Sequence, residues 1–86
     1  MSDETTFTYV LSRPAEVNIR VYTLSGRLVQ YLDGVSGLAG YNQVAWNGLD
    51  GDGHMLANGV YLYKIIARTL DGSQSAEALG KLSIVR

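Results

Sequence analysis

Apolar residues recur at every second position in several short segments, and this alternation restricts the fold more than any other feature. The clearest case is residues 16–23, where Val17, Ile19 and Val21 alternate with polar or charged neighbours. A period of two places successive side chains on opposite faces of an extended strand. Alternation with polar residues is typical of an antiparallel sheet that has one solvated face. Since no stretch shows a helical period, the chain is predicted to be all-β.

Similar segments cover most of the 86 residues, and turn-forming residues separate them. Further strands are expected at 7–11, 28–32, 41–46, 59–68 and 78–85. Gly26 signals a tight turn, Asp33-Gly34 is expected to close the third strand, and Asp71-Gly72 signals a hairpin. Residues 54–57 fit a helical turn or a short edge strand. Six or seven short strands at this spacing predict an Ig-like or fibronectin-III-like antiparallel β-sandwich.

The strand that starts at Gly59 indicates which aromatic residues form the core. Lys64 and Arg68 share one face of this strand, and charged side chains remain in solvent. Tyr61 and Tyr63 lie on the opposite face and are therefore predicted to point inward, with one hydroxyl bonded to a loop backbone. Together with the only Trp, these two tyrosines are the predicted core anchors: Trp46, Tyr61 and Tyr63.

The same aromatic residues offer an alternative interpretation as a stacking platform for a sugar. Such a platform would consist of Trp46, Tyr41, Tyr61 and Tyr63. The alternation favours a core position for these rings and leaves Tyr22 and Tyr31 as the exposed tyrosines. The inward stretch of the fourth strand is expected to start at Val44.

The outer face of the long strand is more apolar than contact with solvent alone would favour. Val60, Leu62 and Ile66 lie on this face. Exposed apolar patches mark interaction sites, so these three residues form a predicted interaction face for a preceding domain or an assembly partner. The alternative is that a neighbouring strand or loop covers them.

Composition excludes several classes of function. Seven Lys and Arg balance eight Asp and Glu, so the chain lacks the basic face that nucleic acids or anionic membranes require. No apolar run has the length of a membrane span, and the first residues do not form a signal peptide. The chain has no Cys. Its length corresponds to one domain, expected at residues 6–86 after an added start or linker at residues 1–5.

Few residues offer catalytic or metal-binding chemistry. Asp50-Gly51-Asp52-Gly53 is similar to the start of a calcium loop, but an EF-hand needs a Glu twelve residues along, where this chain has Tyr61. Turns whose Asp side chains bond their own backbone are the favoured interpretation. His54 is the only histidine and is expected in an exposed loop. We therefore predict no catalytic, cofactor-binding or metal-binding residue, no cofactor and no enzyme activity.

Five spaced elements resemble a known family. They are the Leu11-Ser12 end of the first strand, a strand-Tyr-turn-Gly-Arg unit at 21–28, Ala39-Gly40 ahead of Trp46-Asn47-Gly48, the Asp-Gly repeat at 50–53, and Gly59 to Tyr63. This order resembles the Ig-like domain named after the flagellar hook-capping protein FlgD. The segments GVYLYKI and GKLSIVR are also similar to the C-terminal β-sandwich domains of type IX secretion cargo and surface peptidases. The last hairpin is longer than in those sorting domains, and their Asn-Pro segment is absent.

The resemblance implies a non-catalytic C-terminal Ig-like module of a secreted, cell-surface or periplasmic bacterial protein. Such a module would act in sorting, attachment or domain docking. Its partners would be the preceding domain of the parent protein or the secretion or assembly machinery, without nucleic acid or membrane insertion. The alternatives are a flagellar hook-capping-type assembly domain and a carbohydrate-binding module.

Overall fold

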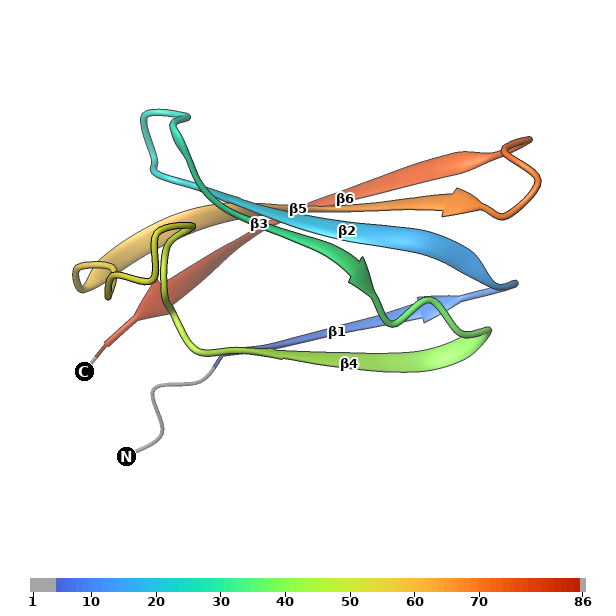
Figure 1. Cartoon of the computed structure of the whole chain (residues 1–86), viewed down its shortest axis with the longest axis horizontal. Helices are drawn as coiled ribbons and strands as arrows, with labels where there is room; N and C mark the ends of the chain where they lie inside the picture. Colours follow the sequence, from blue (N-terminus) through green and yellow to red (C-terminus); the bar gives the residue numbers. More distant parts are fainter. Residues whose placement is uncertain (1–4, 86) are drawn as a thin grey trace.

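The computed structural model describes residues 5–85, which form six strands in two antiparallel sheets (Figure 1). The strands are β1 (Thr5–Leu11), β2 (Ala15–Tyr22), β3 (Leu28–Val35), β4 (Gly40–Trp46), β5 (Gly59–Thr69) and β6 (Ser75–Ile84). The larger sheet has the order β3-β2-β5-β6, and the smaller sheet pairs β1 with β4. This arrangement confirms the predicted all-β, Ig-like sandwich. Of the predicted linker, residues 1–4 lie outside the described part, and Thr5 is the first residue of β1.

The centre of the larger sheet follows the alternation of the sequence. Val17, Ile19 and Val21 of β2 are fully buried, and every residue of β2 pairs with a residue of β5. On β5, Tyr61 and Ile65 are buried, whereas Arg68 is exposed on the opposite face. The charged residues therefore gave the correct orientation of this strand.

No helix in residues 5–85 is long and apolar enough to cross a membrane.

Aromatic rings connect the two sheets. Phe7 of β1 stacks on Trp46 of β4 with 6.1 Å between ring centroids, and it meets Tyr63 of β5 edge-on at 5.2 Å. The ring of Tyr63 continues beneath β6, where a Cβ atom at Gly80 would lie 2.4 Å from it. Gly80 is the cross-strand partner of Tyr63. A row of contacts therefore runs from β4 through β1 and β5 to a glycine on β6, which has to lack a side chain.

The loop between β3 and β4 is fixed by a buried amide. Asn42 is buried, and its Oδ1 accepts hydrogen bonds from Ser36 Oγ at 2.6 Å and Leu38 N at 3.0 Å. Its Nδ2 donates to the carbonyl oxygens of Leu38 at 2.8 Å and Gly40 at 3.1 Å. Because both ends of the amide are satisfied, burial of this polar side chain is tolerated.

Burial of Asn42 corrects two expectations about β4. The inward stretch begins at Asn42 rather than at Val44, since the loop carbonyls and amide supply the hydrogen bonds that a buried amide requires. As a consequence Tyr41, which was not expected in solvent, lies on the outward face and is 64% exposed. Of the two tyrosines that were expected in solvent, Tyr31 is exposed and Tyr22 is half-buried.

The strand β3 runs past the expected stop at Asp33-Gly34 and ends at Val35. Its pairing with β2 shifts between Val17 and Ile19, where one extra β3 residue forms a β-bulge. Gly34 has a φ of 63°, a conformation that glycine adopts without steric cost. The Asp-Gly pair therefore makes a bulge here instead of ending the strand. At Asp71-Gly72 the same pair makes the predicted hairpin between β5 and β6.

Truncation of Trp46 tests the aromatic row. Replacing a buried Trp by Ala removes its packing and leaves a cavity, so Trp46→Ala is expected to lower the free energy of unfolding by about 3–5 kcal/mol. Tyr41→Ala, an exposed position on the same strand, should change it by less than about 0.5 kcal/mol. Urea denaturation monitored by circular dichroism measures both. Equal stabilities of the two variants would contradict the assignment.

The β5–β6 hairpin makes stability depend on pH. The Asp71 carboxylate accepts hydrogen bonds from the backbone amide and the hydroxyl of Ser73 and from the hydroxyl of Thr69. These bonds, given in decreasing order of their effect, lower the pKa of Asp71 from 3.8 to about 2. The fold therefore favours the ionised form, and this contribution to stability is complete above about pH 4. It should decline as the pH falls toward 2. An NMR titration of the Asp71 carboxyl should have its midpoint near pH 2, and a midpoint near 3.8 would refute this. In Asp71→Asn, the loss of stability that this carboxyl causes between about pH 4 and 2 should be absent.

Candidate functional site

The predicted interaction face lies on the outer side of β5. Val60 is 43% exposed, whereas Leu62 and Ile66 are half-buried. Lys64 lies between Leu62 and Ile66 on the same side, and its Nζ is 3.8 Å from a carboxylate oxygen of Glu77 on β6. The three apolar residues therefore share a face, but a charged pair divides them.

The neighbouring strands extend this outer face into a mixed aromatic and charged surface. The guanidinium of Arg20 on β2 lies 5.3 Å from the ring centroid of Tyr31 on β3. A hydrogen bond with Tyr22 is the main cause that raises the pKa of Arg20, so this side chain remains charged. On β6, Leu79 is 76% exposed on the same side. Tyrosine and arginine among apolar residues are typical of protein interfaces.

A second surface, on the outer side of the smaller sheet, was missed at the level of sequence. It carries no charged residue and consists of Thr6, Thr8 and Val10 of β1 with Tyr41, Gln43 and Ala45 of β4. Val10 is 73% exposed and pairs directly with Tyr41, whose hydroxyl accepts a 3.0 Å hydrogen bond from Gln43 Nε2. The signal in the sequence is that each outward set alternates without a single charge.

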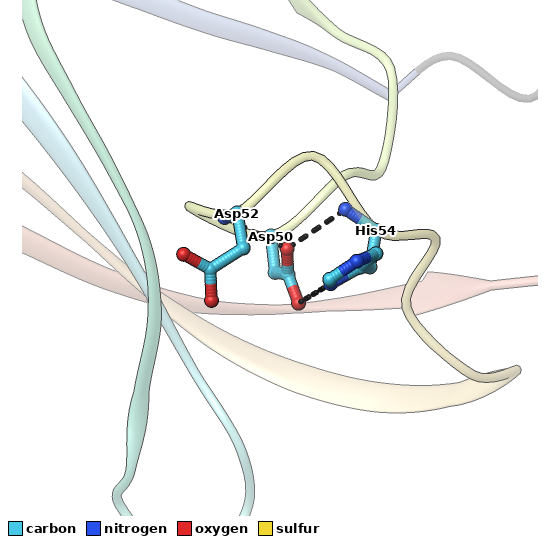
Figure 2. A group of neighbouring side chains, drawn as sticks. All are labelled: Asp50, Asp52 and His54. Atoms are coloured by element: carbon cyan, nitrogen blue, oxygen red, sulfur yellow. Dashed lines mark hydrogen bonds and ion pairs between the residues drawn. The ribbon is translucent and has the colours of Figure 1, made fainter.

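The Asp-Gly repeat forms a closed turn. Asp50 Oδ1 accepts hydrogen bonds from the backbone amides of Asp52 and His54, each at 2.9 Å. Figure 2 shows the bond from His54. The amide of His54 is the main cause that lowers the pKa of Asp50. An isolated bridge joins Leu49 to Met55, so residues 54–57 contain a short bridge and no helical turn. The expectation of Asp side chains bonded to their own backbone therefore describes Asp50.

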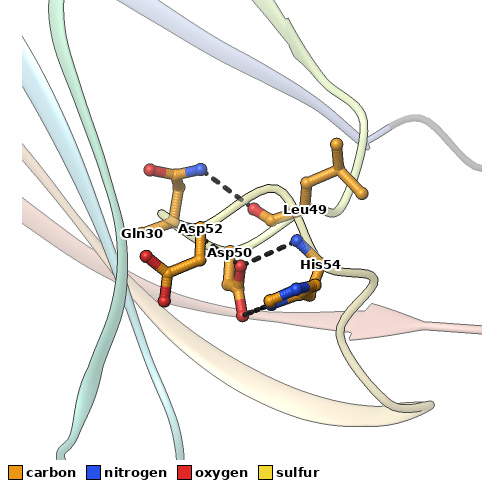
Figure 3. A network of polar contacts seen from close by, with 5 residues as sticks. All are labelled: Gln30, Leu49, Asp50, Asp52 and His54. Atoms are coloured by element: carbon orange, nitrogen blue, oxygen red, sulfur yellow. Dashed lines mark hydrogen bonds and ion pairs between the residues drawn. The ribbon is translucent and has the colours of Figure 1, made fainter.

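The turn is also fastened to its surroundings. The carbonyl oxygen of Leu49 accepts a 2.9 Å hydrogen bond from Gln30 Nε2 on β3 (Figure 3) and a 3.1 Å hydrogen bond from Trp46 Nε1. Gly51 N donates to the carbonyl oxygen of Val29, also on β3, at 2.9 Å. These bonds hold the loop after β4 against the edge of the larger sheet.

The only group of potential metal ligands in the described part of the chain lies in this turn. Asp50, Asp52 and His54 each offer one ligand atom, all within 4.8 Å of one another. His54 and Asp52 are exposed, and His54 Nδ1 lies 3.9 Å from Asp50 Oδ2. Because Asp50 Oδ1 already accepts two backbone amides, the arrangement works as a turn clamp.

The aromatic residues named as core anchors do not form an open platform. Trp46 and Tyr61 are buried and Tyr63 is half-buried against Phe7. The Tyr61 hydroxyl donates a 2.7 Å hydrogen bond to the carbonyl oxygen of Ala57, as one of the two tyrosines was expected to do. Stacking on a sugar would require ring faces that the fold instead covers.

Removal of the Asp50 carboxylate should open the turn. In Asp50→Ala the amides of Asp52 and His54 lose their acceptor, and their hydrogen-exchange rates should rise at least about tenfold, as expected for the loss of a charge-assisted hydrogen bond. Asp52→Ala is the matched control and should leave both rates within about twofold. Unchanged exchange in Asp50→Ala would contradict the clamp.

Solved structures of similar fold include two flagellar proteins. FlgD from P. aeruginosa matches with a TM-score of 0.77 and 22% identity over 94% of this chain and 62% of that protein chain. FlgD from Xanthomonas campestris, whose structure is described as giving insights into the hook capping essential for flagellar assembly, matches with a TM-score of 0.73 and 23% identity. The match covers 95% of this chain and 56% of that protein chain. This chain thus spans about three fifths of these structures. At such identities the likeness shows the fold alone.

A third structure of similar fold is PorZ of Porphyromonas gingivalis, described as an essential bacterial surface component of the type IX secretion system. It matches with a TM-score of 0.51 and 21% identity over 94% of this chain and 11% of PorZ. No match was found among curated proteins. The family model of the FlgD Ig-like domain matches residues 1–71. This chain therefore belongs to the FlgD Ig-like domain family.

Proposed function

We propose that this chain is a non-catalytic docking module of a bacterial envelope or surface protein, which acts in sorting, attachment or domain docking. The observation that carries the proposal is the family match over residues 1–71, together with a fold that recurs in flagellar FlgD and in surface PorZ. In the described part of the chain, the backbone amide of the only histidine donates to Asp50 Oδ1 in the turn clamp.

The outer face of the larger sheet is the proposed docking face, centred on Val60, Leu62 and Ile66. It combines partly exposed apolar side chains with an arginine held against a tyrosine ring, a composition that suits a protein partner. The start of β1 and the end of β6 lie at the same end of the sandwich (Figure 1). A preceding domain of a longer protein would therefore join beside the end of β5 that carries Val60.

Hook-capping-type assembly is the second candidate, favoured by the likeness to the two FlgD structures. It uses the same docking face but places the module in a flagellar scaffold. A carbohydrate-binding role is less well supported, because Trp46 and Tyr61 are buried.

The sorting role can be tested by fusing residues 1–86 to the C-terminus of a periplasmic reporter in a bacterium that has a type IX secretion system. The reporter is expected at the cell surface. Val60→Glu, which places a charge on the docking face, should reduce the surface fraction at least about fivefold through unfavourable burial of that charge in the interface. Cell-surface labelling and fractionation measure this fraction.

Thr8→Glu is the matched control, since it adds the same charge to the exposed outer side of the smaller sheet. It should leave the surface fraction unchanged. If the folded fusion stays in the periplasm, sorting is excluded and domain docking or hook-cap assembly remains. If both variants behave like the unaltered chain, the docking face is wrong.

A further inference from the structure

The strand β1 has one edge without a strand partner in the part of the chain that the structure describes. It pairs with β4 over all seven residues in continuous register, and nothing lies on its other side in the sheet. Its sequence TTFTYVL contains no charge, proline or bulge. Proteins normally protect an exposed edge with such features, because its unpaired amides and carbonyls attract another strand.

The two edges of the larger sheet have such protection. The edge strand β3 has the bulge at Gly34, and β6 carries Glu77 and Lys81. In the smaller sheet β4 also has an edge without a strand partner among the described residues, and its sequence contains no charge or proline. The edge of β1 is the one that lies toward β6, since Phe7 of β1 contacts Tyr63 of β5 while the loop after β4 is bonded to β3.

The larger sheet extends beyond this open edge. The inner face of β6 alternates through Ala76, Ala78 and Gly80 to the buried Ile84, and its pairing with β5 is regular throughout. Ala76 and Ala78 are nevertheless exposed, whereas Ile65, the partner of Ala78 on β5, is buried. The smaller sheet thus ends at β1 and leaves the first half of β6 uncovered.

A hollow of about 480 Å³ lies between the end of β1, the start of β2 and the hairpin that joins β5 to β6. We call this hollow the edge groove. Its lining includes Leu11, Arg13, Ala15, Ala67, Thr69 and Ala76. Arg13 is the only charged side chain among the described residues that line it. Beyond this lining, the exposed inner face of β6 continues through Ala78 toward Gly80, beneath which the Tyr63 ring lies. The stretch of β6 from Ala76 to Gly80 is as long as about five extended residues at 3.3 Å each.

These features select one kind of occupant. Main-chain amides and carbonyls on an edge are satisfied along their whole length only by another extended backbone. A second copy of this chain could offer its own β1 edge and pair antiparallel with this one. Its β6 would then extend past the shared edge from the opposite side. The β6 strands of the two copies would collide there, because each extends beyond its own β1. A single strand without a sheet of its own fits.

We propose that the edge groove binds one extended segment of a partner polypeptide, which adds to β1 as a third strand of the smaller sheet. Side chains at alternate positions of this segment are small or β-branched and cover Ala67, Ala76 and Ala78. A carboxylate of the segment pairs with Arg13. The groove and the docking face lie on opposite sides of the larger sheet, so this binding does not depend on the proposed docking function.

The test is selection from a phage-displayed library of random heptapeptides on the purified 86-residue chain. Selected peptides should alternate in hydrophobicity and contain Asp or Glu. Titration of the best synthetic peptide should show that Ala78→Lys, which places a charge on the exposed inner face of β6, raises Kd at least tenfold. Leu79→Lys adds the same charge to the outer face of the same strand and should leave Kd within twofold. Arg13→Glu should weaken binding of the acidic peptide.

Hydrogen exchange distinguishes strand addition from other binding. On saturation with the peptide, one alternating set of β1 amides should gain protection. The proposal is overturned if no peptide is selected, if Ala78→Lys and Leu79→Lys bind equally well, or if β1 exchange does not change. Self-association that Ala78→Lys abolishes would also overturn it, because the occupant would then be a second copy of the chain.

Discussion

Phe7 makes the contact on which the arrangement of the two sheets depends. The smaller sheet has only two strands and covers a sheet of four, so few side chains hold it in place. Phe7 lies between Trp46 within its own sheet and Tyr63 in the opposite sheet. Edge-on and offset ring pairs of this kind contribute about 0.5–1.5 kcal/mol beyond the area they bury. In a domain of this size, such a contribution is a substantial part of the net stability.

The unequal size of the two sheets also explains where the proposed binding surfaces lie. The core needs one apolar face from each sheet, and the buried residues of β2 and β5 supply that of the larger sheet. The exposed inner face of β6 at Ala76 and Ala78 and the free edge of β1 remain outside this core. The outer face of the larger sheet, which combines apolar and charged residues, and the uncharged outer face of the smaller sheet remain as well. The proposed docking module would therefore offer different partners different parts of one small sandwich.

Most of the fold could be predicted from the alternation, because burial of one face is a property of the strand itself. The inward side of β2 and of β5 follows from Val17, Ile19 and Lys64 alone. Asn42 could not be placed, since its burial depends on hydrogen bonds from a loop that the alternation does not describe. Gly34 was ambiguous because Asp-Gly suits both a turn and a bulge, and only pairing with β2 decides between them.

The candidate surfaces were less predictable for the same reason. Val60, Leu62 and Ile66 could be assigned to an outer face, but the ion pair between Lys64 and Glu77 that divides them depends on sheet order. The open edge of β1 is likewise a property of topology. Which strands pair, and which remain at an edge, follows from contacts between segments far apart in the chain.

The most direct test of this account is native-state hydrogen exchange of the free chain, resolved for each amide of β1. The account predicts that one alternating set of these amides is protected by β4, while the other set exchanges at rates typical of an exposed edge. Uniform protection along β1 would mean that its second edge is already covered, and would contradict both the open sandwich and the proposed strand addition.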